Sequence, residues 1–433
     1  VCWGRAGSGA IPNARGLEWS GWRNPTHWSL QEDYPPIDLG GRKAFALAAG
    51  GGSSNKFQCA MLSAADCDVC RDEIRCWGAN DNGQLGYGDT RNRGVVDGDF
   101  ARDVVDLGAV GVHPAFQVWD YLRDAEPTPP VAMETLTVGY QHACAILALG
   151  RVLCWGQYEH GALGGFQTNS DNVPDPSKGV PVFFGYDERN GPSRDKTFFA
   201  KSISSNDLST CAILEDDSLA CWGRNEYHML GIGGSIQPRG TASNMADVAP
   251  NGIDWRVPVL DRGGDAAKVV DSCQGSFFGC AATSEGDAWC WGQDLNGKLG
   301  LGTNSNPTNT APINQIGSPP TRVDLGADEN GAPLRVVSLS CASQAVCAAF
   351  DDGRVKCWGR NDYGELGRGT NSLIEKSYVG NAAGEMGDAL PFLYLGDGKR
   401  ALKLSAGEEH FCAVLDTHEL KCWGRNYMGA VGA

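Results

Sequence analysis

The tripeptide Cys-Trp-Gly occurs seven times along the chain, and this repeat constrains the fold more than any other feature. Its cysteines are Cys2, Cys76, Cys154, Cys221, Cys290, Cys357 and Cys422. The intervals between them range from 65 to 78 residues. A related segment follows most copies, as in Asn-Asp-Tyr-Gly-Glu-Leu-Gly from Asn361. Self-similarity at a regular period is typical of repeat proteins, whose units bury their apolar faces against one another. We therefore expect one structural unit per repeat.

A second regularity places another cysteine ten residues before five of these copies. The pairs are Cys144–Cys154, Cys211–Cys221, Cys280–Cys290, Cys347–Cys357 and Cys412–Cys422. A hairpin centred within the fourth pair has the loop 351–353, whose third residue, Gly353, suits the left-handed region. In the other pairs this position holds Gly150, Asp217, Gly286 and His418. The cysteines of each pair then face each other across antiparallel strands, within disulfide reach.

The remaining cysteines are interpreted from their repeat positions. Cys59 occupies the first-cysteine position of its repeat and is expected to join Cys76 across a longer excursion. Cys67 and Cys70 lie inside that excursion and are interpreted as a local closure, with a redox-active Cys-x-x-Cys as the alternative. A bridge between consecutive repeats is the interpretation for Cys273 and Cys341, which precede their hairpin cysteines by seven and six residues. Cys2 is left without a partner.

Paired cysteines can also bind zinc, so the choice between metal and disulfide depends on spacing. A tetrahedral zinc site normally takes two close pairs, often as Cys-x₂₋₄-Cys. Here the pairs recur at intervals of about 70 residues with a hairpin inside each, which favours disulfides. Since disulfides persist in oxidising compartments, the 17 cysteines indicate an extracellular or cell-surface protein, made in a secretory pathway or by bacterial export.

Charge and composition exclude several classes of function. The formal net charge of −16 argues against nucleic-acid binding, because neutralising phosphates needs a basic surface. The chain has no apolar stretch of about 18 residues, so no membrane insertion is expected. Glycine supplies 59 of the 433 residues. A chain that turns so often favours an all-β fold of many short strands.

Four combined motifs resemble the regulator-of-chromosome-condensation repeat family, and more closely its cysteine-paired variant in secreted proteins. They are Leu-Ser-Ala-Gly from Leu404, His-x-Cys-Ala from His410, Cys-Trp-Gly-x-Asn from Cys357 and Gly-x-Leu-Gly-x-Gly-Thr from Gly364. The resemblance implies an all-β, seven-bladed β-propeller of four-stranded antiparallel blades with long inter-blade loop inserts.

On this interpretation the chain is a single β-propeller domain over 1–433. Its blade cores are expected around 1–12, 36–88, 131–164, 199–233, 267–302, 334–369 and 399–433, with the inserts between them. Because the sequence starts and stops inside a repeat, these residues are expected to be part of a longer polypeptide.

Aromatic residues are assigned by position. Alternation along a strand turns the tryptophan of Cys-Trp-Gly away from the disulfide, so it should fill the space between blades. One insert carries Trp19, Trp22, Trp28 and Tyr34. These four side chains suggest a contact surface, with packing of the insert onto the scaffold as the alternative. His142 and His410 each stand two residues before a hairpin cysteine, which is a repeat position before it is a catalytic one.

No catalytic constellation is recognised, so the chain is expected to be non-enzymatic, without a cofactor or metal. We expect an extracellular protein-binding scaffold or structural subunit of a surface or appendage assembly, whose partners are other proteins. The resemblance offers one alternative, a secreted inhibitor that binds an enzyme through the propeller face. Carbohydrate binding is less favoured. So is guanine-nucleotide exchange, the activity of the family's founding member, because disulfides and acidic charge do not suit a nuclear exchange factor.

Overall fold

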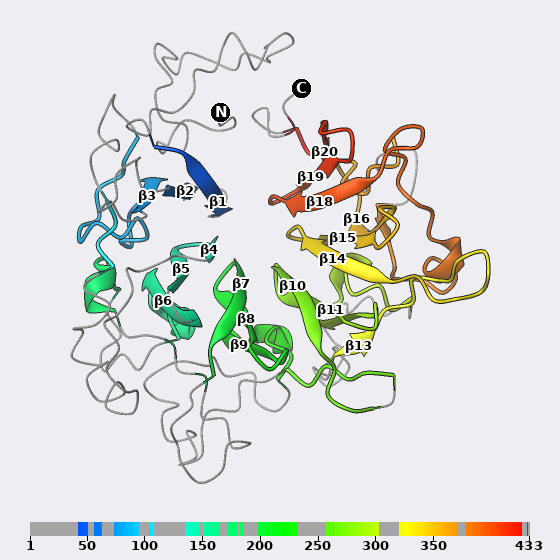
Figure 1. Ribbon diagram of the computed structural model, residues 1–433, viewed down its shortest axis with the longest axis horizontal. Helices are drawn as coiled ribbons and strands as arrows, with labels where there is room; N and C mark the ends of the chain where they lie inside the picture. Colours follow the sequence, from blue (N-terminus) through cyan, green and yellow to red (C-terminus); the bar gives the residue numbers. More distant parts are fainter. Residues whose placement is uncertain are drawn as a thin grey trace, which may run out of the picture. The chain divides into compact units, whose positions relative to one another are not determined.

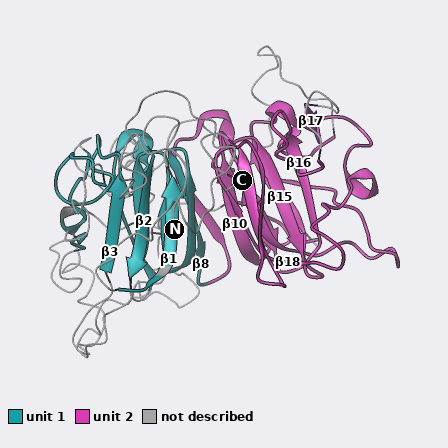
Figure 2. Ribbon diagram, turned by 90° about the horizontal axis from the view of Figure 1, so that it is seen from above, with its two compact units in different colours: residues 1–215, 238–255, 433 teal, residues 216–237, 256–432 magenta. Residues whose placement is uncertain are grey.

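The described residues form short β-strands and 3₁₀ turns, with no α-helix among them. The computed structural model describes residues 42–50, 56–62, 73–94, 104–107, 135–147, 150–164, 172–179, 182, 184, 198–232, 257–262, 264–302, 320–369, 377–426 and 431. This part of the chain contains no helix long and apolar enough to cross a membrane. The chain divides into two compact units, one over 1–215, 238–255 and 433 and the other over 216–237 and 256–432 (Figure 2).

In the first unit, strands pair antiparallel in chain order (Figure 1). One sheet contains β1 (Ala44–Gly50), β2 (Phe57–Leu62) and β3 (Glu73–Gly78). A second contains β4 (Thr135–Val138), β5 (His142–Leu147) and β6 (Arg151–Gly156). Next, β7 (Ala200–Asn206) pairs with β8 (Ser209–Leu214). The first strand of each sheet lies against the first strand of the next, so β4 contacts both β1 and β7.

The second unit repeats this arrangement. It begins with β9 (Leu219–Gly223) and has three sheets. The first is β10 (Val269–Gly275), β11 (Phe278–Thr283), β12 (Ala288–Gly292) and β13 (Thr321–Arg322). The second is β14 (Val336–Cys341), β15 (Ala345–Phe350), β16 (Val355–Arg360) and β17 (Tyr378–Val379). The third is β18 (Ala401–Ala406), β19 (His410–Leu415) and β20 (Leu420–Gly424). Strand β14 lies beside both β10 and β18.

The all-β class of antiparallel sheets is confirmed, but the fourth strand of each blade is smaller than expected. It is two residues long in β13 and β17. In the first unit it is reduced to the single bridges Gly78–Arg93 and Gly156–Val173. Both residues of β13 are exposed. The number of blades and the single domain over 1–433 stay predictions.

The hairpin register follows the cysteine spacing. Strand partners include Cys280 opposite Cys290 and Cys347 opposite Cys357. All five residues expected at the left-handed loop position have positive φ: Gly150 (72°), Asp217 (66°), Gly286 (86°), Gly353 (80°) and His418 (64°). That expectation is confirmed. The loop residue also serves the next sheet, since the Gly286 carbonyl accepts from Val336 N (2.9 Å) and the Gly353 carbonyl from Ala401 N (2.8 Å).

Disulfides join the second and third strands of the sheets. The structure contains Cys59–Cys76, Cys144–Cys154, Cys280–Cys290, Cys347–Cys357 and Cys412–Cys422. Cys211 and Cys221 are disulfide-bonded as well. Each hairpin disulfide holds together the second and third strands of its sheet. Cys2, Cys67 and Cys70 lie outside the described residues.

One further disulfide joins two sheets. Cys273 on β10 is bonded to Cys341 on β14, which lies 68 positions later in the sequence, and their Cα atoms are 5.5 Å apart. The buried Asp271 carboxylate reinforces this contact by accepting from the backbone N–H of Leu339 (2.8 Å). Burial raises the pKa of Asp271, although hydrogen bonds from Leu339, Ser338 and Ser272 oppose the rise. The two first strands are thus linked covalently and by a hydrogen bond.

In four of the Cys-Trp-Gly copies the tryptophan is anchored to the repeat before it. The indole Nε1–H of Trp358 donates to the Lys298 carbonyl (3.1 Å), and that of Trp291 donates to the Met229 carbonyl (3.0 Å). The same bond joins Trp155 to Gln84 (3.0 Å) and Trp423 to Glu365 (2.9 Å). Trp155, Trp291 and Trp358 are fully buried. We call this bond the indole latch.

The acceptor of the indole latch lies in the Gly-x-Leu-Gly segment, which is held in shape by two further residues. An Asn or Asp after Cys-Trp-Gly accepts from the leucine N–H: Asn361 from Leu366 (3.1 Å) and Asp294 from Leu299 (3.1 Å). The final glycine has positive φ, 68° in Gly300. A Cβ atom at Gly300 would lie 3.0 Å from Trp358 Nε1, so this glycine permits the close approach of the indole.

We predict that the disulfide between sheets stabilises the protein more than a hairpin disulfide does. On the loop-entropy model, the 68-residue closure contributes about 4 kcal/mol and a ten-residue closure about 3 kcal/mol. Replacing Cys273 and Cys341 by alanine should therefore lower the free energy of unfolding by more than replacing Cys280 and Cys290. Denaturant titration of the two double variants measures this difference. A larger loss from the hairpin pair would contradict it.

We predict that Trp358→Phe costs about 1–3 kcal/mol, because it leaves the buried Lys298 carbonyl without a donor. Trp289→Phe in the neighbouring sheet is the matched control, since the Trp289 indole N–H has no hydrogen-bond partner among the described residues. Both changes remove the same volume, so the difference between their unfolding free energies isolates the latch. Equal losses would show that the bond contributes nothing to stability.

Candidate functional site

The loops after the Cys-Trp-Gly strands reach from one sheet to the next in the second unit. We call residues 224–231, 293–302 and 360–369 the tail loops, and residues 276–277, 342–344 and 407–409 the inner turns. The Tyr227 ring packs edge-on against Phe277, with centroids 5.4 Å apart. The Asn296 amide donates to Gln344 Oε1 (2.6 Å). These contacts fix each tail loop against the inner turn that follows it.

The third contact of this kind is an ionic cluster around Tyr363. Arg360 and Arg425 lie over the Tyr363 ring, at 5.3 and 4.3 Å from its centroid. Glu409, in the inner turn, forms ion pairs with Arg360 (3.4 Å) and with Arg425. Arg360 also donates through Nε to Asp362 (2.5 Å). The ring of Tyr363 remains 42% exposed, so it is held firmly and still faces solvent.

A similar but smaller cluster surrounds Tyr227. Arg224 lies 4.9 Å from the centroid of the Phe277 ring and donates to Glu226 Oε2 (2.6 Å). Tyr227 is 37% exposed. Together, Arg224, Tyr227, Phe277, Arg360, Tyr363, Glu409 and Arg425 are named the Tyr–Arg surface. Each of the two exposed tyrosines belongs to a cluster that also contains arginine. This composition is typical of protein–protein contacts.

Two buried charged groups lie at the same repeat position beneath the tail loops. Glu365 accepts from the Tyr363 N–H (2.7 Å), and burial raises the pKa of its carboxyl. Lys298 donates to the Ser276 carbonyl (2.7 Å) and to Gln293 Oε1 (3.1 Å). Burial lowers the pKa of Lys298 to about 7, although the nearby Asp294 opposes this. Glu365 thus bonds to the backbone of its own tail loop, and Lys298 joins its tail loop to the inner turn at Ser276.

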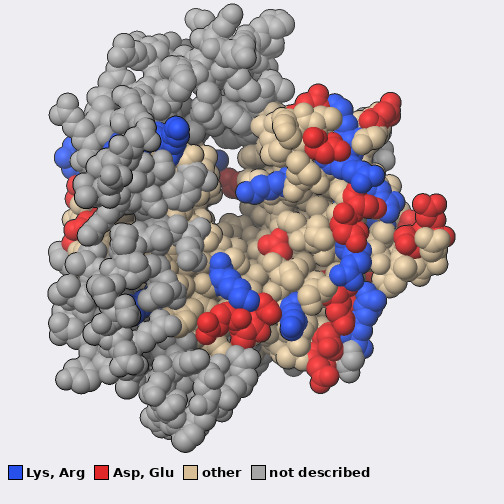
Figure 3. Space-filling view, viewed as in Figure 1, with Lys and Arg blue, Asp and Glu red and all other residues tan. Residues whose placement is uncertain are grey.

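Arg360 and Arg425 of the Tyr–Arg surface keep their charge. Hydrogen bonding to Glu409 raises the pKa of Arg425. Burial opposes the charge of Arg360, but Asp362, Glu365 and Glu409 together raise its pKa. Acidic and basic side chains also alternate over the part of the second unit that contains β14 to β20 (Figure 3). Such a surface favours a partner with its own mixed charges rather than a polyanion.

The residues expected from sequence to form a contact surface, Trp19, Trp22, Trp28 and Tyr34, lie outside the described residues. His142 is fully buried, and its Nε2 lies 2.9 Å from Thr210 Oγ1. Burial lowers the pKa of His142 to about 4. Within the described part of the chain, no group of three His, Cys, Asp or Glu residues could hold a metal ion.

Sequence reasoning missed the Tyr–Arg surface. A signal was present, because Arg-Asn follows Cys-Trp-Gly at Arg224, Arg360 and Arg425. Two of these copies continue to a tyrosine two residues after the asparagine. The contact with the inner turn of the next sheet is not visible in the sequence, since about 50 residues separate Arg360 from Glu409.

We predict that Lys298 makes stability depend on pH. Its pKa is about 7 in the folded protein and 10.5 ordinarily, so the folded state binds fewer protons between these values. The free energy of unfolding should therefore rise by about 2 kcal/mol from pH 7 to pH 9. Lys298→Met should abolish this rise, whereas the exposed Lys403→Met should keep it. Denaturant titrations at both pH values measure the effect, and an unchanged rise in Lys298→Met would contradict the prediction.

Comparison with known families and proteins assigns the repeat. Family models described as "Regulator of chromosome condensation (RCC1) repeat" match residues 135–161, 336–365 and 402–430, and residues 352–414. The chain is 27% identical over 289 residues to human E3 ubiquitin-protein ligase HERC2, matching 66% of this chain and 5% of that protein. It is 22% identical to the Arabidopsis thaliana ultraviolet-B receptor UVR8, over 90% of this chain and 79% of the receptor. The chain thus spans only a small part of HERC2.

Solved structures show the same fold. Prp20p from Saccharomyces cerevisiae matches 99% of this chain and 81% of its own, with a TM-score of 0.59 and 15% identity. Human WBSCR16 matches 90% of this chain and 79% of its own, with a TM-score of 0.57 and 13% identity. At such low identity the likeness concerns the fold alone, which is a β-propeller. Residues 135–161 and 336–430 of the chain therefore carry repeats of the regulator-of-chromosome-condensation type.

Proposed function

We propose that this chain is an extracellular, non-enzymatic scaffold that binds other proteins through its Tyr–Arg surface. The observation that carries the proposal is the geometry of Tyr363, which is 42% exposed while two arginines and an inner-turn glutamate fix its surroundings. An aromatic side chain held in one place loses little conformational freedom on binding, so more of its contact energy remains as affinity.

Similar proteins support a protein-binding function. Yeast Prp20 has been solved with Kap60 bound, and Prp20p is described with its binding to Gsp1p and histones. These partners are all proteins, and they show that the fold offers surfaces for protein recognition. For this chain, the net charge of −16 disfavours surroundings crowded with DNA. We therefore propose that this chain, like yeast Prp20, has proteins as its partners.

The state of the cysteines supports an oxidising location. Every cysteine among the described residues is disulfide-bonded. In a reducing cytosol such bonds would be reduced, and the sheets would lose the cross-links between their second and third strands. Outside the cell the disulfides keep the scaffold rigid, so its loops stay in place for a partner. The extracellular location is therefore part of the proposal.

We predict that the two exposed tyrosines determine partner binding. Oxidised, tagged protein should capture a specific partner from the medium or cell surface of its source, and Tyr227→Ala with Tyr363→Ala should weaken that binding about 30-fold, as expected for loss of about 2 kcal/mol at a hot spot. Tyr394→Ala is the matched control, because Tyr394 is 72% exposed outside this surface. Affinities are measured by surface plasmon resonance on the captured partner.

Two outcomes would overturn the proposal. If the double tyrosine variant and Tyr394→Ala bind the partner as tightly as the unmodified protein, the Tyr–Arg surface is not the binding site. If the partners are exclusively cytosolic and the protein from its native source carries free thiols at Cys347 and Cys357, the extracellular assignment is wrong.

A further inference from the structure

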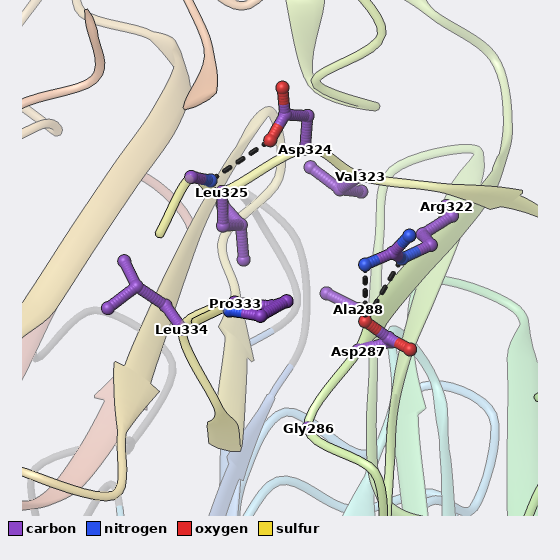
Figure 4. Close-up of a pocket in the computed structure, with 10 residues that line it drawn as sticks. Gly286, Asp287, Ala288, Arg322, Val323, Asp324, Leu325, Pro333 and Leu334 are labelled. Carbon is purple, nitrogen blue, oxygen red and sulfur yellow. Dashed lines mark hydrogen bonds and ion pairs between the residues drawn. The ribbon is translucent and has the colours of Figure 1, made fainter. Parts of the chain in front are cut away.

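The second unit contains a pocket away from the Tyr–Arg surface, at the opposite ends of strands β11 and β12. It has a volume of about 240 Å³, and residues 286–288, 322–326 and 333–334 line it. Figure 4 shows Arg322 and Asp287 on one side and Leu325, Pro333 and Leu334 on the other. The pocket therefore combines a charged wall with an apolar wall. Its size suits one small side chain with its attached polar group.

The charged wall contains two arginines on one carboxylate. Asp287, only 4% exposed, receives Arg262 Nε at 2.8 Å and Arg322 Nη2 at 2.8 Å. Arg322 Nε donates to the same carboxylate (3.0 Å). Among the described residues, no contact uses Arg322 Nη1, and the side chain is 47% exposed. The two guanidinium groups and one carboxylate of this triad carry a net positive charge with N–H donors to spare, and Glu285 faces the Arg262 side of it by accepting from the Arg262 backbone N–H (3.2 Å).

The apolar wall comes from Val323, Leu325 and Leu334, each less than 9% exposed. All three line the pocket. A ligand that contacts these side chains and Arg322 together must place an aliphatic group next to a hydrogen-bond acceptor. Burying an aliphatic side chain of this size contributes about 1.5–3 kcal/mol, which is enough for weak but specific binding.

Other charges around the pocket limit the ligand to a single negative charge. Asp324 also lines the pocket, but its carboxylate accepts from the Gly326 N–H (3.0 Å) and lies close to Gly387. Lys356 lies beneath, donating to the Leu325 carbonyl (2.8 Å). Two carboxylates in the wall would repel a dianionic phosphate, whereas a carboxylate can bond to the free end of the Arg322 guanidinium.

We propose that this pocket binds the C-terminal residue of a peptide that ends in leucine or valine. The α-carboxylate would bond to Arg322, and the aliphatic side chain would contact Val323, Leu325 and Leu334. Arg262 holds Asp287 in place and keeps Arg322 from being neutralised completely. The proposal is independent of the Tyr–Arg surface, because it needs only this pocket.

The test is a calorimetric titration of the purified, oxidised protein with the synthetic peptide acetyl-Gly-Gly-Gly-Leu. The same peptide with a C-terminal amide should bind at least tenfold more weakly, because it lacks the carboxylate. Arg322→Gln should have the same effect on the acid peptide, while Asp287 keeps its partner Arg262. Arg354→Gln is the matched control, since Arg354 is 44% exposed, pairs with Asp352 and does not line the pocket. It should bind like the unmodified protein.

The remaining arms separate the alternatives. N-acetyl-leucine binding as tightly as the peptide would show that the site takes a free aliphatic acid and not a chain end. Equal binding of the acid and the amide, or no heat of binding at 5 mM peptide, would overturn the proposal. Tyr363→Ala should leave the titration unchanged, so a failure here does not bear on partner capture by the Tyr–Arg surface.

Discussion

The hydrogen bond from a buried indole to a backbone carbonyl of the preceding repeat is the interaction on which the rest of this structure depends. It brings together segments about 60 residues apart, as in Trp358 and Lys298. Leaving either group unpaired inside the protein would cost more than the bond itself contributes, so the geometry around it is narrowly defined. The glycine at Gly300 and the carboxylate of Asp294 shape the loop that carries the acceptor. Once the loop is shaped, the side chains on its outer surface have fixed positions.

The sequence was informative where the relevant partners are close in the chain. Ten-residue cysteine spacing and a turn residue at the centre identified each hairpin, and the positive φ of Asp217 and His418 agrees even without glycine. The tryptophan position was also readable, because side chains alternate along a strand. The hairpins and the tryptophan position can be predicted from strand alternation and turn geometry, because both act within a single repeat.

Features that depend on two repeats were harder to foresee. The fourth strand is only two residues long in β13 and β17, a length that no periodic pattern in the sequence marks. Lys298 reads as a surface residue by composition, yet it is fully buried because Ser276 and Gln293 supply acceptors. The Tyr–Arg surface forms only when a tail loop meets the inner turn of the following sheet. The insert that carries Trp19 to Tyr34, which the sequence singled out, lies outside the described residues.

The indole latch uses a main-chain oxygen as its acceptor, and this has a consequence for how such proteins diversify. The residue that supplies the carbonyl is Gln84, Met229, Lys298 or Glu365 in different repeats. Neutral, apolar, basic and acidic residues therefore all occur at the position that supplies the acceptor. A repeat copied or exchanged by recombination would meet its new neighbour through the same backbone atom, while a buried side chain there, such as that of Lys298, keeps polar partners of its own. The order and sequence of the repeats can therefore change in evolution while the hydrogen bond between neighbours is kept, because its acceptor is a main-chain atom.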